Sequence, residues 1–259
     1  MPPRPSVFDP ELGPLTDDLL TGGLRVYQRA KGHRFSSDDV ATAFVAAHAA
    51  PAARRILDLG CGLGSVLLTL AWKLPEASLV GVEAQAMSFE LCRRNVERNG
   101  LGARVSIHHG DLRDPAIQLR LGGGFELVTG TPPYFPPGSA VDADDEQRAY
   151  ARIEYRGGVE AYLDAARAQL AEAGSFVMCG DARAEPRVQR AAAELGLALV
   201  ATTEGIAREG EAPLFSVWTL RREAEGEPRR ERLVLRDARG GRTDDADRLR
   251  SFCGFPIGA

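Results

Sequence analysis

The sequence has few cysteines, no long apolar run and no excess of positive charge. Its cysteines are Cys61, Cys92, Cys179 and Cys253. They show neither zinc-site spacing nor a disulfide framework, so we expect reduced thiols in a cytoplasmic protein. No apolar run approaches the roughly 20 residues that cross a bilayer, and the Pro-rich start lacks the apolar core of a signal peptide. No cluster of His, Cys and carboxylates suggests a metal. We therefore expect neither a membrane segment nor a metal site.

The charge is close to balanced and slightly acidic. The 32 Lys and Arg and the 36 Asp and Glu give a formal net charge of -4 over 259 residues. This argues against a protein that coats nucleic acid through a global basic field, although a local basic groove stays open. The length suffices for one large α/β domain with a full core.

Short apolar segments alternate with helical stretches through the middle of the chain. The expected strands are 55–59, 79–82, 105–108, 125–129, 175–179, 198–203 and 215–220. The expected helices between them are 66–74, 86–99 and 158–171. This alternation is typical of a doubly wound, mainly parallel seven-stranded sheet, in which the last two strands can form an antiparallel edge.

The segments on either side of this core are less regular. Residues 1–50 are expected to form a small N-terminal element, irregular at first, then with a short strand at 24–28 and a helix that Ser37-Asp38-Asp39 can cap. Residues 51–222 form the expected core. Residues 223–259 are expected to be a charged hinge, a short strand at 233–235 and a polar tail.

The most informative segment follows the first strand of the core. Asp58 is followed by Gly60, Gly62 and Gly64 and then by an apolar helical run. Glycines allow a sharp turn and close approach to a ligand. The spacing Gly-x-Gly-x-Gly differs from the Gly-x-Gly-x-x-Gly of nicotinamide enzymes. It resembles the first motif of class I methyltransferases that use S-adenosyl-L-methionine (SAM), in which Asp58 could accept hydrogen bonds from the ammonium end. The alternative is a strand-to-helix turn without a ligand.

Acidic residues also end the next two expected strands. Glu83 could accept both ribose hydroxyls of SAM. Asp111 could accept the adenine amino group, and the backbone amide of Leu112 could donate to a ring nitrogen. Each feature alone is common in solvated turns. Their succession after the glycine turn favours the cofactor interpretation.

Thr131-Pro132-Pro133-Tyr134 follows the fourth strand. The prolines stiffen the loop and remove two donors, so the Thr131 hydroxyl and the Pro132 carbonyl could face a substrate as acceptors. Tyr134 could stack on a planar ring. The segment resembles the Asn-Pro-Pro-Tyr motif of amino-methyltransferases, which act on nitrogens conjugated to a π system. Threonine in place of asparagine offers one shorter acceptor. The alternative is a Pro-rich strand exit with an exposed aromatic.

Over roughly residues 15–255 the chain resembles the tRNA adenine-N6 methyltransferase family that modifies the adenine beside the anticodon of tRNA(Val). The matching segments are 17–20, 32–38, 147–149, 152–154 and 213–215. The resemblance implies a class I, Rossmann-like fold and an N-terminal element over the SAM site. It also implies that Phe35, Ser36 and Asp38 line the methionine end of SAM.

The resemblance implies a SAM-dependent N-methyltransferase whose substrate is an adenine amine in structured RNA such as tRNA. Thr131, Pro132 and Tyr134 would then act on the acceptor base. Two alternatives remain. A methyltransferase for a small molecule or a protein side chain is favoured by the acidic chain and by Thr131. A SAM-binding protein without catalysis is disfavoured by the intact Pro-Pro-Tyr segment.

Overall fold

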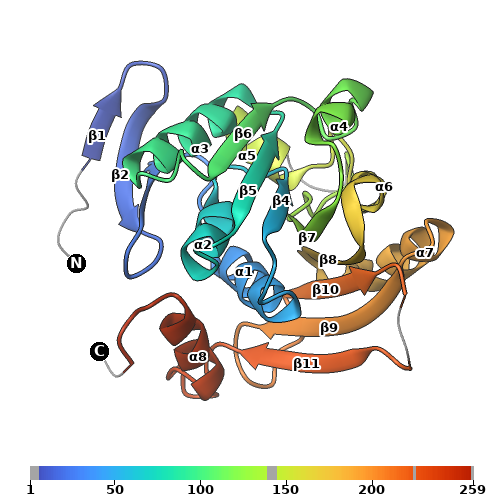
Figure 1. Ribbon diagram of the computed structural model, residues 1–259. Helices are drawn as coiled ribbons and strands as arrows, with labels where there is room; N and C mark the ends of the chain where they lie inside the picture. The colour runs from blue at the N-terminus through green and yellow to red at the C-terminus, as the bar shows by residue number, and fades with distance from the viewer. Residues whose placement is uncertain (1–5, 139–144, 224–225, 258–259) are drawn as a thin grey trace.

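An eight-stranded sheet forms the centre of the computed structural model, which describes residues 6–138, 145–223 and 226–257 (Figure 1). Its strand order is β11-β9-β10-β8-β7-β4-β5-β6. The strands are β4 (Arg55–Leu59), β5 (Ser78–Glu83), β6 (Val105–His109), β7 (Phe125–Gly130), β8 (Leu170–Asp181), β9 (Ala198–Ile206), β10 (Phe215–Arg221) and β11 (Arg229–Val234). Strand β10 is antiparallel to both neighbours, and the other pairings are parallel. The predicted mainly parallel sheet is confirmed. It has one strand more than predicted, because β11 pairs with β9 at the edge.

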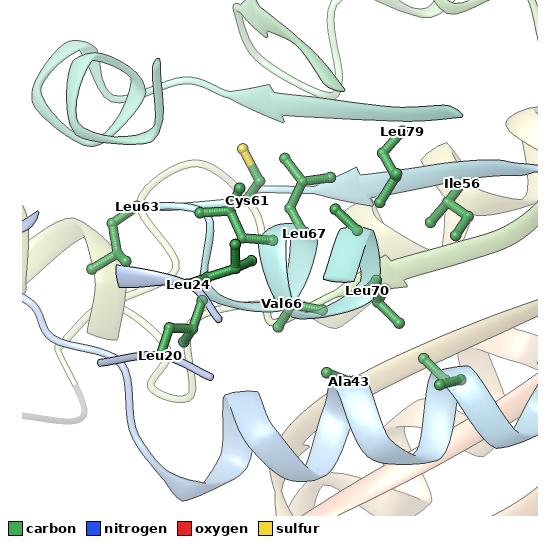
Figure 2. Packing of buried hydrophobic residues seen from close by; sticks show 14 of the residues in the cluster. Leu20, Leu24, Ala43, Ile56, Cys61, Leu63, Val66, Leu67, Leu70 and Leu79 are labelled. Atoms are coloured by element: carbon green, nitrogen blue, oxygen red, sulfur yellow. The ribbon is translucent and has the colours of Figure 1, made fainter. Parts of the chain in front are cut away.

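Helices cover both faces of this sheet. One face carries α1 (Ser37–Ala49), α2 (Ser65–Lys73) and α3 (Ala86–Arg98), and the other carries α4 (Pro115–Leu121), α6 (Val159–Gln169) and α7 (Glu185–Glu194). Because successive strand side chains point to opposite faces, Ile56 packs into the core with α1 and α2, whereas Leu57 packs into the core with α6 and α7. Figure 2 shows α2 between the sheet and α1, with Val66, Leu67 and Leu70 among the packed side chains.

The N-terminal segment forms a second, three-stranded antiparallel sheet of β1 (Ser6–Asp9), β2 (Gly13–Leu19) and β3 (Arg25–Arg29). The expectation of irregular structure before residue 15 was therefore wrong for β1 and the start of β2, while the short strand near 24–28 is confirmed. Two asparagines hold this sheet, Asn95 within α3 and Asn99 at its C-cap. The side chain of Asn95 accepts from Tyr27 N (2.7 Å) and donates to Tyr27 O (3.1 Å). Asn99 does the same for Arg25 N (3.1 Å) and O (2.8 Å).

The C-terminal segment is more ordered than the expected hinge and polar tail. Residues 229–234 form β11, and α8 (Asp244–Phe252) follows. Thr243 caps α8 by accepting from Ala246 N (3.2 Å), and Leu249 and Phe252 are buried. These are the two buried residues of α8, and most of their neighbours in the sequence are charged. So short an apolar pattern did not predict a helix from the sequence. No helix in the described ranges is both long and apolar enough to cross a bilayer.

Candidate functional site

The glycine turn follows β4 and rests on the end of β5. Gly60 and Gly62 have φ values of +62° and +56°, in the left-handed region that side chains disfavour. A Cβ at Gly60 would also lie 2.0 Å from the hydroxyl of Tyr162. The amide of Gly62 donates to Glu83 Oε2 (2.8 Å). This bond joins the glycine turn to the residue that is predicted to bind the ribose. Gly60, Gly62, Glu83 and Tyr162 line one cleft.

Glu83 is positioned by backbone donors on both of its oxygens. Besides Gly62, the amide of Gln85 donates to Oε1 (2.7 Å). Burial nevertheless raises the pKa of Glu83, which shows that the carboxylate is poorly solvated. Because each carboxylate oxygen has two lone pairs, Glu83 retains acceptor capacity toward the cleft.

Asp58 is buried at the end of β4, with 2% of its surface exposed. Its register partner on β7 is Thr129, whose hydroxyl donates to Oδ1 (2.8 Å). Its Oδ2 has no hydrogen-bond partner among the described residues. Burial raises the pKa of Asp58 to about 7. An unpaired buried carboxylate oxygen is costly. Asp58 is not among the residues that line the cleft.

Asp39, on the first turn of α1, is a cleft residue that the sequence analysis missed. It accepts from the hydroxyl of Ser65 (3.0 Å) and from the amide of Ser36 (2.8 Å). Burial and the neighbouring Asp38 raise the pKa of Asp39 to about 7. The sequence did not predict this position in the cleft, because helix capping alone accounts for two acidic residues in a first turn.

The predicted methionine-end residues divide into two groups. Phe35 lines the cleft. Ser36 and Asp38 are not among the lining residues. Ser36 donates its hydroxyl to Asp38, and Asp38 accepts from the hydroxyl of Tyr134 (2.6 Å). Asp38 therefore joins α1 to the loop after β7.

Asp111 and Leu112 line the cleft after β6, and their contacts with adenine stay a prediction. Asp111 is held by Arg113, which donates from Nε to Oδ1 (2.9 Å) and from Nη2 to Oδ2 (2.7 Å). This bidentate pairing lowers the pKa of Asp111. Asp111 thus stays ionised and keeps only part of its acceptor capacity for a ligand.

The Thr131-Pro132-Pro133-Tyr134 loop reaches the cleft through Thr131 and Pro133, whereas Pro132 is buried. The ring of Tyr134 packs against the core between α1 and the sheet. Its hydroxyl donates to Asp38 and lies 3.1 Å from Cys179 Sγ. Burial raises the pKa of Tyr134. Its stacking on a base stays a prediction. The structure shows in addition that its hydroxyl ties the loop after β7 to Asp38 of α1.

The remaining wall of the cleft comes from segments far apart in the sequence. His33 precedes α1, while Tyr150, Ala151, Arg156 and Gly157 lie in and after α5 (Glu146–Arg152). The sequence analysis did not assign these residues to the site. The signals in the sequence were the segments 32–38, 147–149 and 152–154, which resemble the tRNA adenine-N6 methyltransferase family.

Comparisons with known proteins agree with this geometry. Residues 30–144 match the family described as Methyltransferase small domain. The chain is 31% identical over 191 residues to the tRNA1(Val) (adenine(37)-N6)-methyltransferase of Yersinia pestis, covering 73% of this chain and 74% of that protein. It is also 39% identical over 101 residues to the release factor glutamine methyltransferase of Geobacter sulfurreducens, covering 39% of this chain and 34% of that protein. The chain thus spans only about a third of the length of that relative.

Solved structures show the same fold. A predicted O-methyltransferase from Agrobacterium tumefaciens superposes with a TM-score of 0.61 at 18% identity, over 87% of this chain and all of that one. TYW2 of Pyrococcus horikoshii, in complex with MeSAdo, superposes with a TM-score of 0.54 at 16% identity, over 80% and 70% of the two chains.

The fold and the cleft at the ends of β4, β5 and β6 are those of a class I methyltransferase, which confirms the predicted class of enzyme. Within this class, the chain belongs to the tRNA1(Val) (adenine(37)-N6)-methyltransferase family. Membership implies SAM as the cofactor, as predicted.

The residues around the cleft fit SAM. Asp39 and Glu83 line the cleft beside the glycine turn, while Asp58 is buried at the end of β4, is not among the lining residues, and has an Oδ2 without a partner among the described residues. SAM carries an ammonium and a sulfonium group, whose positive charges would favour the ionised form of these acids. In the described part of the chain, no group of three or more His, Cys, Asp or Glu side chains could hold a metal ion.

Proposed function

We propose that this protein transfers a methyl group from SAM to the exocyclic amine of an adenine in structured RNA such as tRNA, in the cytoplasm. The observation that carries the proposal is that Thr131, in the loop after β7, lines the same cleft as Gly62 and Glu83. A target amine bound by this loop would therefore lie in the same cleft as the SAM-binding residues. Membership of a tRNA adenine-N6 methyltransferase family supports the choice of base.

On the cofactor side, Asp58 and Asp39 bind the ammonium end of SAM, and Phe35 packs beside it. Glu83 accepts the ribose hydroxyls, while Asp111 and the Leu112 amide bind adenine. Gly60, Gly62 and Gly64 allow the backbone to approach the ligand. His33 and Phe35, which line the cleft, support the proposal that the N-terminal element covers this site. Residues 51–222 then supply the core to which it is attached.

On the acceptor side, the Thr131 hydroxyl and the Pro132 carbonyl accept hydrogen bonds from the target amine and orient its lone pair toward the cofactor. SAM, when bound, supplies the electrophilic methyl group. The amine is conjugated to the base and loses its proton late, so the chain needs no strong general base. Its residues mainly provide alignment and exclude water.

A protein side chain is the second candidate acceptor. The match to release factor glutamine methyltransferases favours it, because a glutamine amide is also a nitrogen conjugated to a π system. That match covers 101 residues, whereas the tRNA methyltransferase match covers 191. The longer match supports RNA.

Transfer of a tritiated methyl group from SAM to total tRNA, rRNA, release factors and metabolite fractions tests the proposal. We expect label in tRNA and, after nuclease digestion, in N6-methyladenosine. Label confined to protein would refute the RNA assignment and support the second candidate. Absence of label in every fraction, with SAM bound, would refute catalysis.

A further inference from the structure

The segment after the acceptor loop is anchored to the cofactor site by one buried side chain. Gln147 of α5 is 1% exposed, accepts from the amide of His33 (3.2 Å) and donates to the hydroxyl of Ser88 (3.2 Å). Ser88 donates to Gln85 Oε1 (2.7 Å), and the backbone amide of Gln85 donates to Glu83 Oε1 (2.7 Å). Hydrogen bonds through Ser88 and Gln85 thus connect the inner face of α5 to Glu83, the residue proposed to bind the ribose.

The same segment is paired with the acceptor loop. Phe135 forms a parallel bridge with Ile153, in which Phe135 N donates to Arg152 O (3.0 Å) and Glu154 N donates to Phe135 O (2.9 Å). Glu154 is held in turn by two bonds from Arg187 (2.7 and 2.9 Å). The loop after β7 that contains Thr131 (the acceptor loop) is therefore hydrogen-bonded to the segment 145–157. Together they form one edge of the cleft.

The outer face of this edge is basic. Arg148 and Arg152 stand four residues apart, and hence on one side of α5, and both are exposed. Neither has a carboxylate within 4.0 Å in the described ranges, and Asp145, which lies near Arg148, is bonded to Arg29 (2.7 Å). The same helix contributes Tyr150 and Ala151 to the lining of the cleft, so the two guanidinium groups stand on an element that borders it.

Aromatic rings accompany these charges. The guanidinium group of Arg152 lies 5.5 Å from the centre of the Phe135 ring, and that of Arg156 lies 4.6 Å from the centre of the Tyr150 ring. Tyr150 lines the cleft. Guanidinium groups for phosphates and rings for unstacked bases are the combination by which proteins bind single-stranded RNA loops.

We propose that Arg148 and Arg152 contact the phosphates that flank the target nucleotide, and that Tyr150 stacks on a neighbouring base. This inference rests on the proposed function and identifies the surface that brings RNA to the cleft. The formal net charge of -4 means that a polyanion must be attracted by such a local patch.

The test measures the affinity of tRNA for wild type and for the double variant Arg148→Ala/Arg152→Ala as a function of salt. Loss of two phosphate contacts should weaken binding about 30-fold at 0.1 M salt and reduce the slope of log K against log salt by about 1.4 to 1.8. SAM affinity and the circular dichroism spectrum should stay unchanged. Tyr150→Ala should weaken binding about fivefold or more without changing the slope, because stacking carries no charge.

The matched control is Arg190→Ala/Arg239→Ala, which removes two exposed arginines on α7 and after β11, segments that contribute no lining residue to the cleft. It should leave the slope unchanged, and Arg148→Lys/Arg152→Lys should restore the slope. Equal weakening by both alanine doubles, or an unchanged slope for Arg148→Ala/Arg152→Ala, would overturn the inference and leave RNA methylation standing. A wild-type protein that neither binds nor methylates RNA would refute the inference and the proposed function together. Salt-dependent binding to an acidic protein instead would assign the surface to that class of partner.

Discussion

The two sides of the cleft are built in different ways. Most of the cofactor side follows the ends of the adjacent parallel strands β4, β5 and β6, with the glycine turn, Glu83 and Asp111, and α1 adds Asp39. The acceptor side combines His33, Thr131 and Tyr150 from three separate segments. Strand order therefore brings the glycine turn, Glu83 and Asp111 together, whereas the acceptor residues depend on side-chain contacts such as those of Gln147.

The two sides also differ in charge. Asp39 and Asp58 on the cofactor side have pKa values raised to about 7 because burial disfavours their ionised forms. Arg148 and Arg152 stand exposed at the acceptor side. An acidic interior suits a cationic cofactor, and a basic rim suits a polyanionic substrate.

The largest effect is expected for SAM binding in Glu83→Ala. This change removes the proposed ribose acceptor and leaves the amides of Gly62 and Gln85 without their partner. We expect SAM affinity to fall by about 2 kcal/mol or more, as for lost charged hydrogen bonds. Calorimetry measures the loss, and Glu83→Gln, which keeps the shape, should lose less. Unchanged SAM affinity in a folded Glu83→Ala protein would refute the ribose assignment.

Tyr134→Ala should affect turnover more than SAM affinity. If the ring covers one face of the target base, kcat should fall by the equivalent of about 1–3 kcal/mol while SAM still binds. Tyr134→Phe keeps the ring and removes the hydroxyl bonded to Asp38, so most of the turnover should remain. Steady-state kinetics and SAM calorimetry on both variants, with thermal unfolding as a control, decide the matter. Equal losses for SAM and substrate would make Tyr134 a structural anchor.

SAM affinity should rise with pH up to about 7 and level off above it. The pKa values of Asp39 and Asp58, raised to about 7, mean that both acids are largely protonated below this pH. The ammonium of SAM favours their ionised forms, so binding below pH 7 releases protons and weakens by up to about tenfold per pH unit for each acid. Calorimetry in buffers with different ionisation enthalpies counts the released protons, and Asp58→Asn should release fewer. A SAM affinity independent of pH in wild type would contradict the assignment of both carboxylates.

Thr131→Asn should have the smallest effect. Asparagine restores the acceptor used by the resembling amino-methyltransferases, so RNA methylation should hold or rise. If the natural acceptor is a different nucleophile, asparagine would crowd the site and leave its amide poorly bonded, at a cost of about 1–3 kcal/mol. Wild type and variant are compared on tRNA and on the fraction that wild type methylates best. Loss of all activity in the variant, with no RNA methylation by either form, would support the small-molecule or protein alternative.

The core was predictable because its signals are local. The strand at 55–59 matches β4, and the expected strands at 125–129 and 215–220 end within one residue of β7 and β10. Runs of buried apolar residues bounded by polar turns identify such strands without knowledge of their partners. The helix α5 and the strands β1 and β2 lack such runs, because their residues are ordered by contacts with distant segments. Pairing with β3 orders β2, and Gln147 orders α5.

The sequence by itself determined the glycine turn, the acids at the ends of successive strands and the Pro-Pro-Tyr loop, because each is a short pattern whose chemistry follows from its own residues. The fold was needed to show that Asp39 lines the cleft, that Tyr134 is bonded to Asp38, and that Gln147 of α5 accepts from the amide of His33. These pairings join residues separated by up to about a hundred positions, and no local pattern records them. They arise because parallel strands and the helices on one face of the sheet bring distant segments to one edge.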